Sequence, residues 1–153
     1  MSEPGFPLTI TRFIAAAPAK VWDIMANRQE EWWCPKPWRA VFDKLEKRPG
    51  GVSLVTMYGP DGEVNPHNGF VLAWDEGHRF AFTDAIKPDL MPDGPFMLGI
   101  WSVEPASVDG IDGTRYTAVA RHWSQETMEH HREMGFEQGW GVCADQLQAL
   151  CEA

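Results

Sequence analysis

Cysteine is scarce in this sequence, and the shortage excludes two kinds of stabilising framework. Only Cys34, Cys143 and Cys151 occur in 153 residues, and no two of them have Cys-X-X-Cys spacing. An odd number of scattered cysteines makes neither a disulfide framework nor a zinc site. A chain of this length buries roughly two-thirds of its unfolded surface, so one hydrophobic core is enough to hold it together. We expect core thiols, no metal and no cofactor.

Long apolar runs and basic clusters are also missing. No apolar run approaches the roughly 20 residues of a membrane span. The first seven residues lack the basic and apolar regions of a secretory signal. With 13 Lys and Arg against 22 Asp and Glu, the net charge of −9 repels phosphate backbones. We therefore expect a cytoplasmic protein that binds neither nucleic acid nor membrane.

Large apolar side chains are present in excess. The chain holds eight Trp, eight Phe and seven Met. Each Trp carries an N–H group that needs a partner when it is buried. This composition indicates either a core that is simply rich in Trp or a cavity lined by aromatic side chains, and composition alone leaves both interpretations open.

Alternating apolar residues and turn residues predict one α+β domain over residues 7–153, after a flexible tail at residues 1–6. Pro18 begins a short helix over 18–25, and Asn27 with Glu30 predicts a capped second helix over 28–33. The predicted strands are 7–14, 38–47, 52–58, 63–74 with a bulge at Asn65-Pro66, 79–85, 96–104 and 114–122, the last two joined by a loop over 107–113. Turns at this spacing indicate an antiparallel meander.

The C-terminal part is predicted to form one long helix that begins at Ser124 and runs through residue 150. Its apolar residues recur at steps of four and three, which is one face of an α-helix; they are Phe136, Trp140, Cys143, Leu147 and Leu150. Gly135 and Gly139 lie one turn apart and predict a flat notch where the sheet or a ligand approaches closely. This helix is the only element long enough to cover the sheet.

Several segments resemble a known superfamily. They are 17–22 (APAKVW), Trp32-Trp33, 69–72 (GFVL), 80–84 (FAFTD), 113–116 (GTRY), 134–141 (MGFEQGWG) and 145–147 (DQL). With the predicted element order, they resemble the START-like (SRPBCC) superfamily of helix-grip proteins, within the branch named after the activator of heat-shock-protein ATPase (Aha1-type). The resemblance covers residues 7–150. It implies a seven-stranded curved antiparallel sheet that wraps the long helix around an internal cavity. It is weak evidence for function, because this fold hosts many functions.

Strand parity places Asp84 and His122 on inward faces, as the strongest candidates for general acid–base catalysis. The alternative is that each caps a strand end by bonding backbone or water. His67, at the Asn65-Pro66 bend, is either a polar ligand anchor or a turn residue. His130 and His131 lie among acidic residues at spacings that match no metal motif, so we expect a solvated helix face.

The candidate ligand-binding residues are Trp32, Trp33, Met57, His67, Phe82, Asp84, Trp101, Tyr116, His122, Met134 and Trp140. An irregular loop over 87–95 carries Leu90 and Met91, either as a lid or with both side chains tucked down.

Three functions follow from the resemblance and this lining. The first is binding of a small hydrophobic molecule (lipid, aromatic or polyketide-like) by a carrier or sensor. The second is a cofactor-independent cyclase, dehydratase or hydrolase that uses Asp84, His122 or His67. The third is a chaperone-cofactor-like interaction domain, which we do not expect because the chain shows no second domain and no chaperone-docking motif. A homodimer through exposed strand or loop surface stays open.

Overall fold

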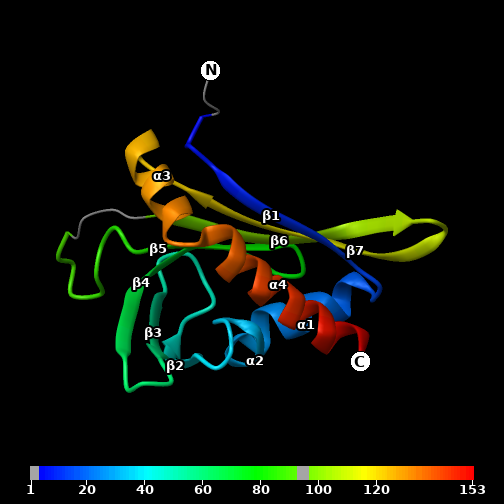
Figure 1. Ribbon diagram of the computed structural model, residues 1–153, viewed down its shortest axis with the longest axis horizontal. Coiled ribbons are helices and arrows are strands. Elements are labelled where there is room, and N and C mark those ends of the chain that lie inside the picture. Colours follow the sequence, from blue (N-terminus) through cyan, green and yellow to red (C-terminus); the bar gives the residue numbers. More distant parts are fainter. Residues whose placement is uncertain (1–3, 93–96) are drawn as a thin grey trace.

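Seven antiparallel strands form one curved sheet in the computed structural model, which describes residues 4–92 and 97–153 (Figure 1). The strands are β1 (Leu8–Ile14), β2 (Arg39–Leu45), β3 (Val52–Tyr58), β4 (Val64–Asp75), β5 (Arg79–Thr83), β6 (Leu98–Val108) and β7 (Ile111–Arg121). They lie in the order β1-β7-β6-β5-β4-β3-β2. Strands β2 to β7 are therefore a meander, and β1 joins it beside β7.

Four helices accompany the sheet. They are α1 (Pro18–Asn27), α2 (Gln29–Trp32), α3 (Gln125–Glu133) and α4 (Phe136–Glu152). Helix α4 packs against β1, α1 and α2, so the two early helices and the last one lie on the same face of the sheet (Figure 1). The predicted helix-grip architecture is confirmed. Within the described residues, no helix is long and apolar enough to cross a membrane.

The C-terminal helix is not continuous, contrary to our prediction. Gly135 has a φ of 95°, and this left-handed residue ends α3 and precedes α4. A residue with a side chain adopts this conformation only with strain, whereas glycine adopts it freely. The helical segment begins after Ser124, close to the predicted start, and Ser124 caps α3, because its side chain accepts a hydrogen bond from the backbone N–H of Thr127. The break lets α3 and α4 point in different directions.

The predicted glycine notch is also different in detail. A Cβ atom at Gly139 would meet nothing within 4 Å, and at Gly135 it would meet only the side chain of Gln138. No part of the sheet therefore approaches these glycines closely. Gly135 allows the chain to change direction between the two helices, and Gly139 faces open space.

Three other local predictions were wrong. The β6–β7 connection is a two-residue turn at Asp109-Gly110, both with positive φ, so the strands are longer than predicted.

The β3–β4 register is continuous through Pro66, and the sheet's irregularities lie at Phe42/Lys44 and Val71/Ala73 instead. Pro66 is accommodated because β5 pairs with β4 only from Phe70 onward. Asn27 closes α1, and no side chain caps α2.

Candidate functional site

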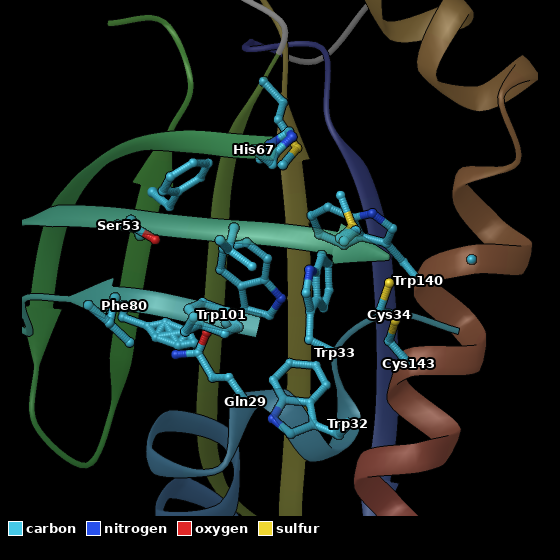
Figure 2. A pocket seen from close by; sticks show the side chains of 18 of the residues that line it. Gln29, Trp32, Trp33, Cys34, Ser53, His67, Phe80, Trp101, Trp140 and Cys143 are labelled. Carbon is cyan, nitrogen blue, oxygen red and sulfur yellow. The ribbon is translucent and has the colours of Figure 1, made fainter. Parts of the chain in front are cut away.

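A cavity of about 510 Å³ lies on the helix-covered side of the sheet (Figure 2). Strands β2, β3, β4, β5 and β6 contribute to one wall, and the segment around α2, the end of α3 and helix α4 contribute to the other. The aromatic part of its wall consists of Trp32, Trp33, Trp74, Phe80, Phe82, Trp101 and Trp140. The aromatic composition therefore serves both a core and a cavity.

Three indoles from three different elements meet at this wall. Trp33 follows α2, Trp101 lies on β6 and Trp140 lies on α4 (Figure 2). Trp101 and Trp140 stack with ring centroids 5.3 Å apart. Trp33 stands edge-on to both, at 5.5 Å from Trp101 and 5.2 Å from Trp140. Such contacts add about 0.5–1.5 kcal/mol each beyond the burial of area, so they hold the sheet and the helices together across the cavity.

Acceptors are present for the indole N–H groups of Trp22, Trp32 and Trp74. Trp32 donates to the carbonyl oxygen of Met25 at 3.2 Å. Trp22 and Trp74 both donate to Glu76, at 3.0 and 2.8 Å, and these hydrogen bonds lower the pKa of the Glu76 carboxyl. Trp101 differs, because its buried Nε1 has no hydrogen-bond partner among the described residues. A buried donor in this state costs about 1–3 kcal/mol.

His67 and Asp84 are neighbours at the upper end of the cavity seen in Figure 2, where His67 is labelled. Nε2 of His67 lies 3.7 Å from Oδ2 of Asp84, which is too long for a hydrogen bond. Asp84 also accepts the backbone N–H of Met97 at 3.2 Å. Burial lowers the pKa of His67, and the nearby Asp84 carboxyl opposes that shift. His67 lines the cavity, whereas Asp84 stands behind it.

The partnership of Asp84 with His122 is not formed. His122 instead contacts His131, with Nε2 of His122 2.8 Å from Nδ1 of His131. Nδ1 of His122 lies 2.8 Å from the carbonyl oxygen of Phe6, and the His122 backbone N–H donates to the carbonyl of Gly5 at 2.8 Å. The end of the predicted flexible tail is thereby bonded to the end of β7; residues 1–3 lie outside the described part.

His131 is buried at the cavity wall, and our prediction that it is solvated was wrong. Its ring contacts Phe136 at 5.1 Å and Trp140 at 6.0 Å. Burial, followed by the charges of His122, His67 and His130, lowers the pKa of His131 to about 4. One signal was present in the sequence: His131 follows Met128 by three residues, so the two share the inner side of α3. His130 is exposed and borders the cavity.

The other predicted ligand-binding residues divide into two groups. The first group lies at the wall and comprises Met57, Phe82, Met134 and the four predicted tryptophans Trp32, Trp33, Trp101 and Trp140. Met134 is 63% exposed where α3 meets α4. Tyr116 is fully buried behind the wall, edge-on to Trp32 at 6.2 Å, and burial raises the pKa of its hydroxyl. Neither Tyr116 nor His122 lines the cavity.

The loop after β5 does not tuck its apolar side chains into the domain. Leu90 and Met91 are 75% and 58% exposed, and neither lines the cavity. The predicted loop extends to residue 95, and its last three residues lie outside the described part of the structure.

Sequence reasoning missed several wall residues. Cys34, Cys143, Gln29 and Ser53 line the cavity, and so do apolar strand residues such as Val55 and Val71. Burial raises the pKa of the Cys34 thiol, and it raises that of Cys143 to about 12, so neither is a ready nucleophile. In the part of the chain that the structure describes, no three His, Cys, Asp or Glu side chains gather as a metal site would require.

Comparison with known families assigns the chain. The family model described as "Activator of Hsp90 ATPase homolog 1-like protein" matches residues 15–152. The chain belongs to this family. The predicted resemblance to the Aha1-type branch is thereby confirmed. The family description mentions activation of Hsp90, but the match alone does not assign that role to this chain. No curated protein matches the sequence.

Solved structures of related bacterial proteins support the assignment of the chain to this family. The chain is similar to a protein from Nitrosomonas europaea, with 31% identity over 97% of this chain and 95% of the other, and a TM-score of 0.85. A protein from Mycobacterium smegmatis is 32% identical over 97% and 92% of the two chains, with a TM-score of 0.77. The structure of Ara h 8.0201, at 12% identity, 95% and 96% coverage and a TM-score of 0.54, shares the fold alone.

Proposed function

We propose that this protein binds a small hydrophobic molecule in the cavity, as a carrier or a sensor. The observation that carries the proposal is the cavity of about 510 Å³ with an aromatic wall, between the sheet and the helices. This volume falls within the range of about 300–1,000 Å³ that small-molecule sites occupy. The faces of Trp33, Trp101 and Trp140 suit a planar or acyl ligand.

The chemistry of the wall supports binding over catalysis. The polar members of the described lining are Gln29, Ser53, His67, His130 and His131. Both cavity thiols have pKa values raised by burial, so they are mostly protonated at neutral pH. An apolar cavity with a few neutral polar groups fixes a ligand's orientation without attacking it.

A cofactor-independent enzyme is a second candidate, and the pairing of His67 with Asp84 favours it. A neutral His67 at the cavity wall is a suitable proton acceptor, and ligand binding would have to close the 3.7 Å gap to the carboxylate. A substrate screen that compares the wild type with His67→Gln tests this candidate. Turnover that depends on His67 supports it, and turnover that is unchanged in the variant removes it.

A cavity-filling variant gives a direct test of the binding proposal. Gly139 lies at the wall of the cavity, and a Cβ there meets nothing within 4 Å. The Gly139→Leu variant should therefore place its side chain in the cavity, while Leu is a better helix former than Gly. We expect it to fold and to lose binding of the neutral fluorescent probe N-phenyl-1-naphthylamine.

The matched control is Gln138→Leu, which adds the same side chain at the neighbouring exposed position. It should bind the probe like the wild type. Native mass spectrometry of protein purified gently from its own host complements this test by showing any ligand already bound. Equal probe binding by Gly139→Leu and the wild type would refute the cavity as the binding site.

A further inference from the structure

A serine hydroxyl lies on the cavity wall, on the inward face of a strand. Ser53, Val55 and Met57 are alternate residues of β3, and all three line the cavity, so their side chains share this face. Ser53 is only 4% exposed. Figure 2 shows it among the side chains that line the cavity. A polar group is thus buried on the surface that a ligand would contact.

The sheet register gives Ser53 no polar side chain as a cross-strand neighbour. Ser53 pairs with Leu45 of β2 on one side and with Gly69 of β4 on the other. Leu45 also lines the cavity. A Cβ at Gly69 would come within 3.0 Å of the Phe82 ring, so this ring covers the place beside the serine. Ser53 therefore lies between an aliphatic and an aromatic neighbour.

The hydroxyl of Ser53 differs from the other buried hydroxyls of the domain. Thr83 donates to the carbonyl oxygen of Met97 at 3.4 Å, and Thr114 donates to that of Ala16 at 2.7 Å. No hydrogen bond joins the Ser53 hydroxyl to another group in the described part of the chain. Burial without a partner is costly for a hydroxyl, so this position favours a partner from outside the chain.

The cavity offers no counter-charge to a charged ligand. Its described lining contains no Asp, Glu, Lys or Arg side chain. Burial lowers the pKa of His67 and of His131, which keeps both rings neutral at physiological pH. A charged group would lose its hydration here without gaining an oppositely charged partner, which is costly. The lining therefore favours an uncharged ligand.

We propose that the cavity takes an uncharged ligand with an apolar, aromatic body and one carbonyl oxygen, and that this oxygen accepts a hydrogen bond from the hydroxyl of Ser53. The inference rests on the proposed function and specifies its ligand class, that of aryl ketones and esters. A carbonyl suits an apolar neighbourhood because it only accepts, so one hydrogen bond gives both groups a partner. A ligand hydroxyl would bring a hydrogen that needs an acceptor of its own.

Two molecules of nearly the same shape test the proposal on the full chain at pH 7.5. They are 2-acetylnaphthalene, which has the carbonyl, and 2-isopropenylnaphthalene, which has a CH₂ group in place of the oxygen. We expect Ser53→Ala to weaken binding of the ketone about fivefold and to leave binding of the hydrocarbon within about twofold of the wild type. The charged 2-naphthoate should bind the wild type more weakly than both.

The matched control is Ser102→Ala. Ser102 lies on β6 next to the inward Trp101, so it belongs to the other face of the sheet. This variant should bind the ketone and the hydrocarbon like the wild type.

Two further measurements separate a ligand contact from a structural role. Because Ser53 makes no hydrogen bond within the described fold, Ser53→Ala should keep the urea midpoint of the wild type or raise it. The carbonyl stretch of bound 2-acetylnaphthalene should lie at a lower frequency in the wild type than in an apolar solvent, and it should return to the solvent value in Ser53→Ala.

A lowered urea midpoint, equal changes in affinity for the ketone and the hydrocarbon, or tight binding of the naphthoate overturns the inference and leaves the binding function standing. Failure of all three naphthalenes to bind, with a bare mass for protein from the native host, overturns the proposed function and the inference with it.

Discussion

The side-chain amide of Gln146 on α4 donates a hydrogen bond to the carbonyl oxygen of Trp32, at 2.8 Å. The same nitrogen lies 3.0 Å from the carbonyl oxygen of Cys34, and the amide oxygen accepts the backbone N–H of Lys36 at 3.1 Å. One side chain thus satisfies three backbone groups, one in the last residue of α2 and two in the segment that follows it. That segment carries Trp33, so Gln146 fixes part of the cavity wall.

Gln146→Leu should lower the free energy of unfolding by about 2–3 kcal/mol, because it leaves partly buried backbone groups without partners. Urea denaturation measures this loss. Gln138→Leu on the same helix is the control, and as an exposed substitution it should stay within about 0.5 kcal/mol of the wild type. A similar effect for both variants would show that the hydrogen bonds of Gln146 contribute little.

Gly135 and Gly139 should respond in opposite directions to the same substitution. Gly135→Ala should destabilise the fold by about 1 kcal/mol or more, because alanine is strained at a φ of 95°. Gly139→Ala should stabilise it by up to about 1 kcal/mol, since this position lies inside α4 and its Cβ meets nothing within 4 Å. Thermal unfolding of the two variants provides the comparison. A stabilised Gly135→Ala would mean that α3 and α4 can join into one helix.

His131 should make the protein sensitive to mild acid. Its pKa is about 4 in the fold, below the ordinary value of 6.5, because burial and then the neighbouring His122, His67 and His130 oppose its charge. The unfolded chain therefore binds the proton more readily between pH 6.5 and about 4. Stability is complete above this window and decreases as the pH falls through it, by roughly 3 kcal/mol from this group.

The measurement is urea denaturation at several pH values between 7 and 4.5. His131→Phe should show a shallower decrease than the wild type, whereas His78→Phe, at an exposed position, should keep the slope of the wild type. An unchanged slope in His131→Phe would assign the acid sensitivity to other groups.

The three thiols should resist modification in the folded protein. All are buried, and burial raises the pKa of Cys34, of Cys143 to about 12 and of Cys151 to about 11. Because the thiolate is the reactive form, Ellman's reagent at pH 7.5 should label no thiol while the fold persists, and three in denaturant. Rapid labelling of Cys34 or Cys143 in the native protein would show that the cavity opens to the reagent.

The sequence was sufficient for the architecture because strand alternation and turn residues are local signals. Strands β3 and β4 and helix α1 lie within a few residues of their predicted bounds. The break at Gly135 was missed because the apolar period of residues 136–150 appeared to continue back to Ser124. A glycine inside a helix and a left-handed glycine between two helices look the same in a sequence, because only the backbone dihedral angles distinguish them.

The residues that line the cavity were predicted better than the contacts between its polar side chains. Large apolar residues such as Trp101 and Trp140 reached the cavity wall because strand and helix periodicity place them inward. The partners of the histidines were not predicted, since His122 meets His131 only after α3 folds back over the end of β7. Such a contact depends on the bend of the chain at residues 123–124, between β7 and α3, which periodicity does not encode.

The strand order has a consequence for how the chain emerges from the ribosome. Strands β2 to β7 each pair with the strand made just before or after, but Leu8 of β1 pairs with Ala120 of β7. Strand β1 therefore cannot pair until β7 has been synthesised, and pairings of such long range form slowly. Helix α4, which covers the sheet and packs against β1, is synthesised later still. The nascent chain thus keeps an open apolar face until α4 has been made, and only then does it acquire a place for a ligand.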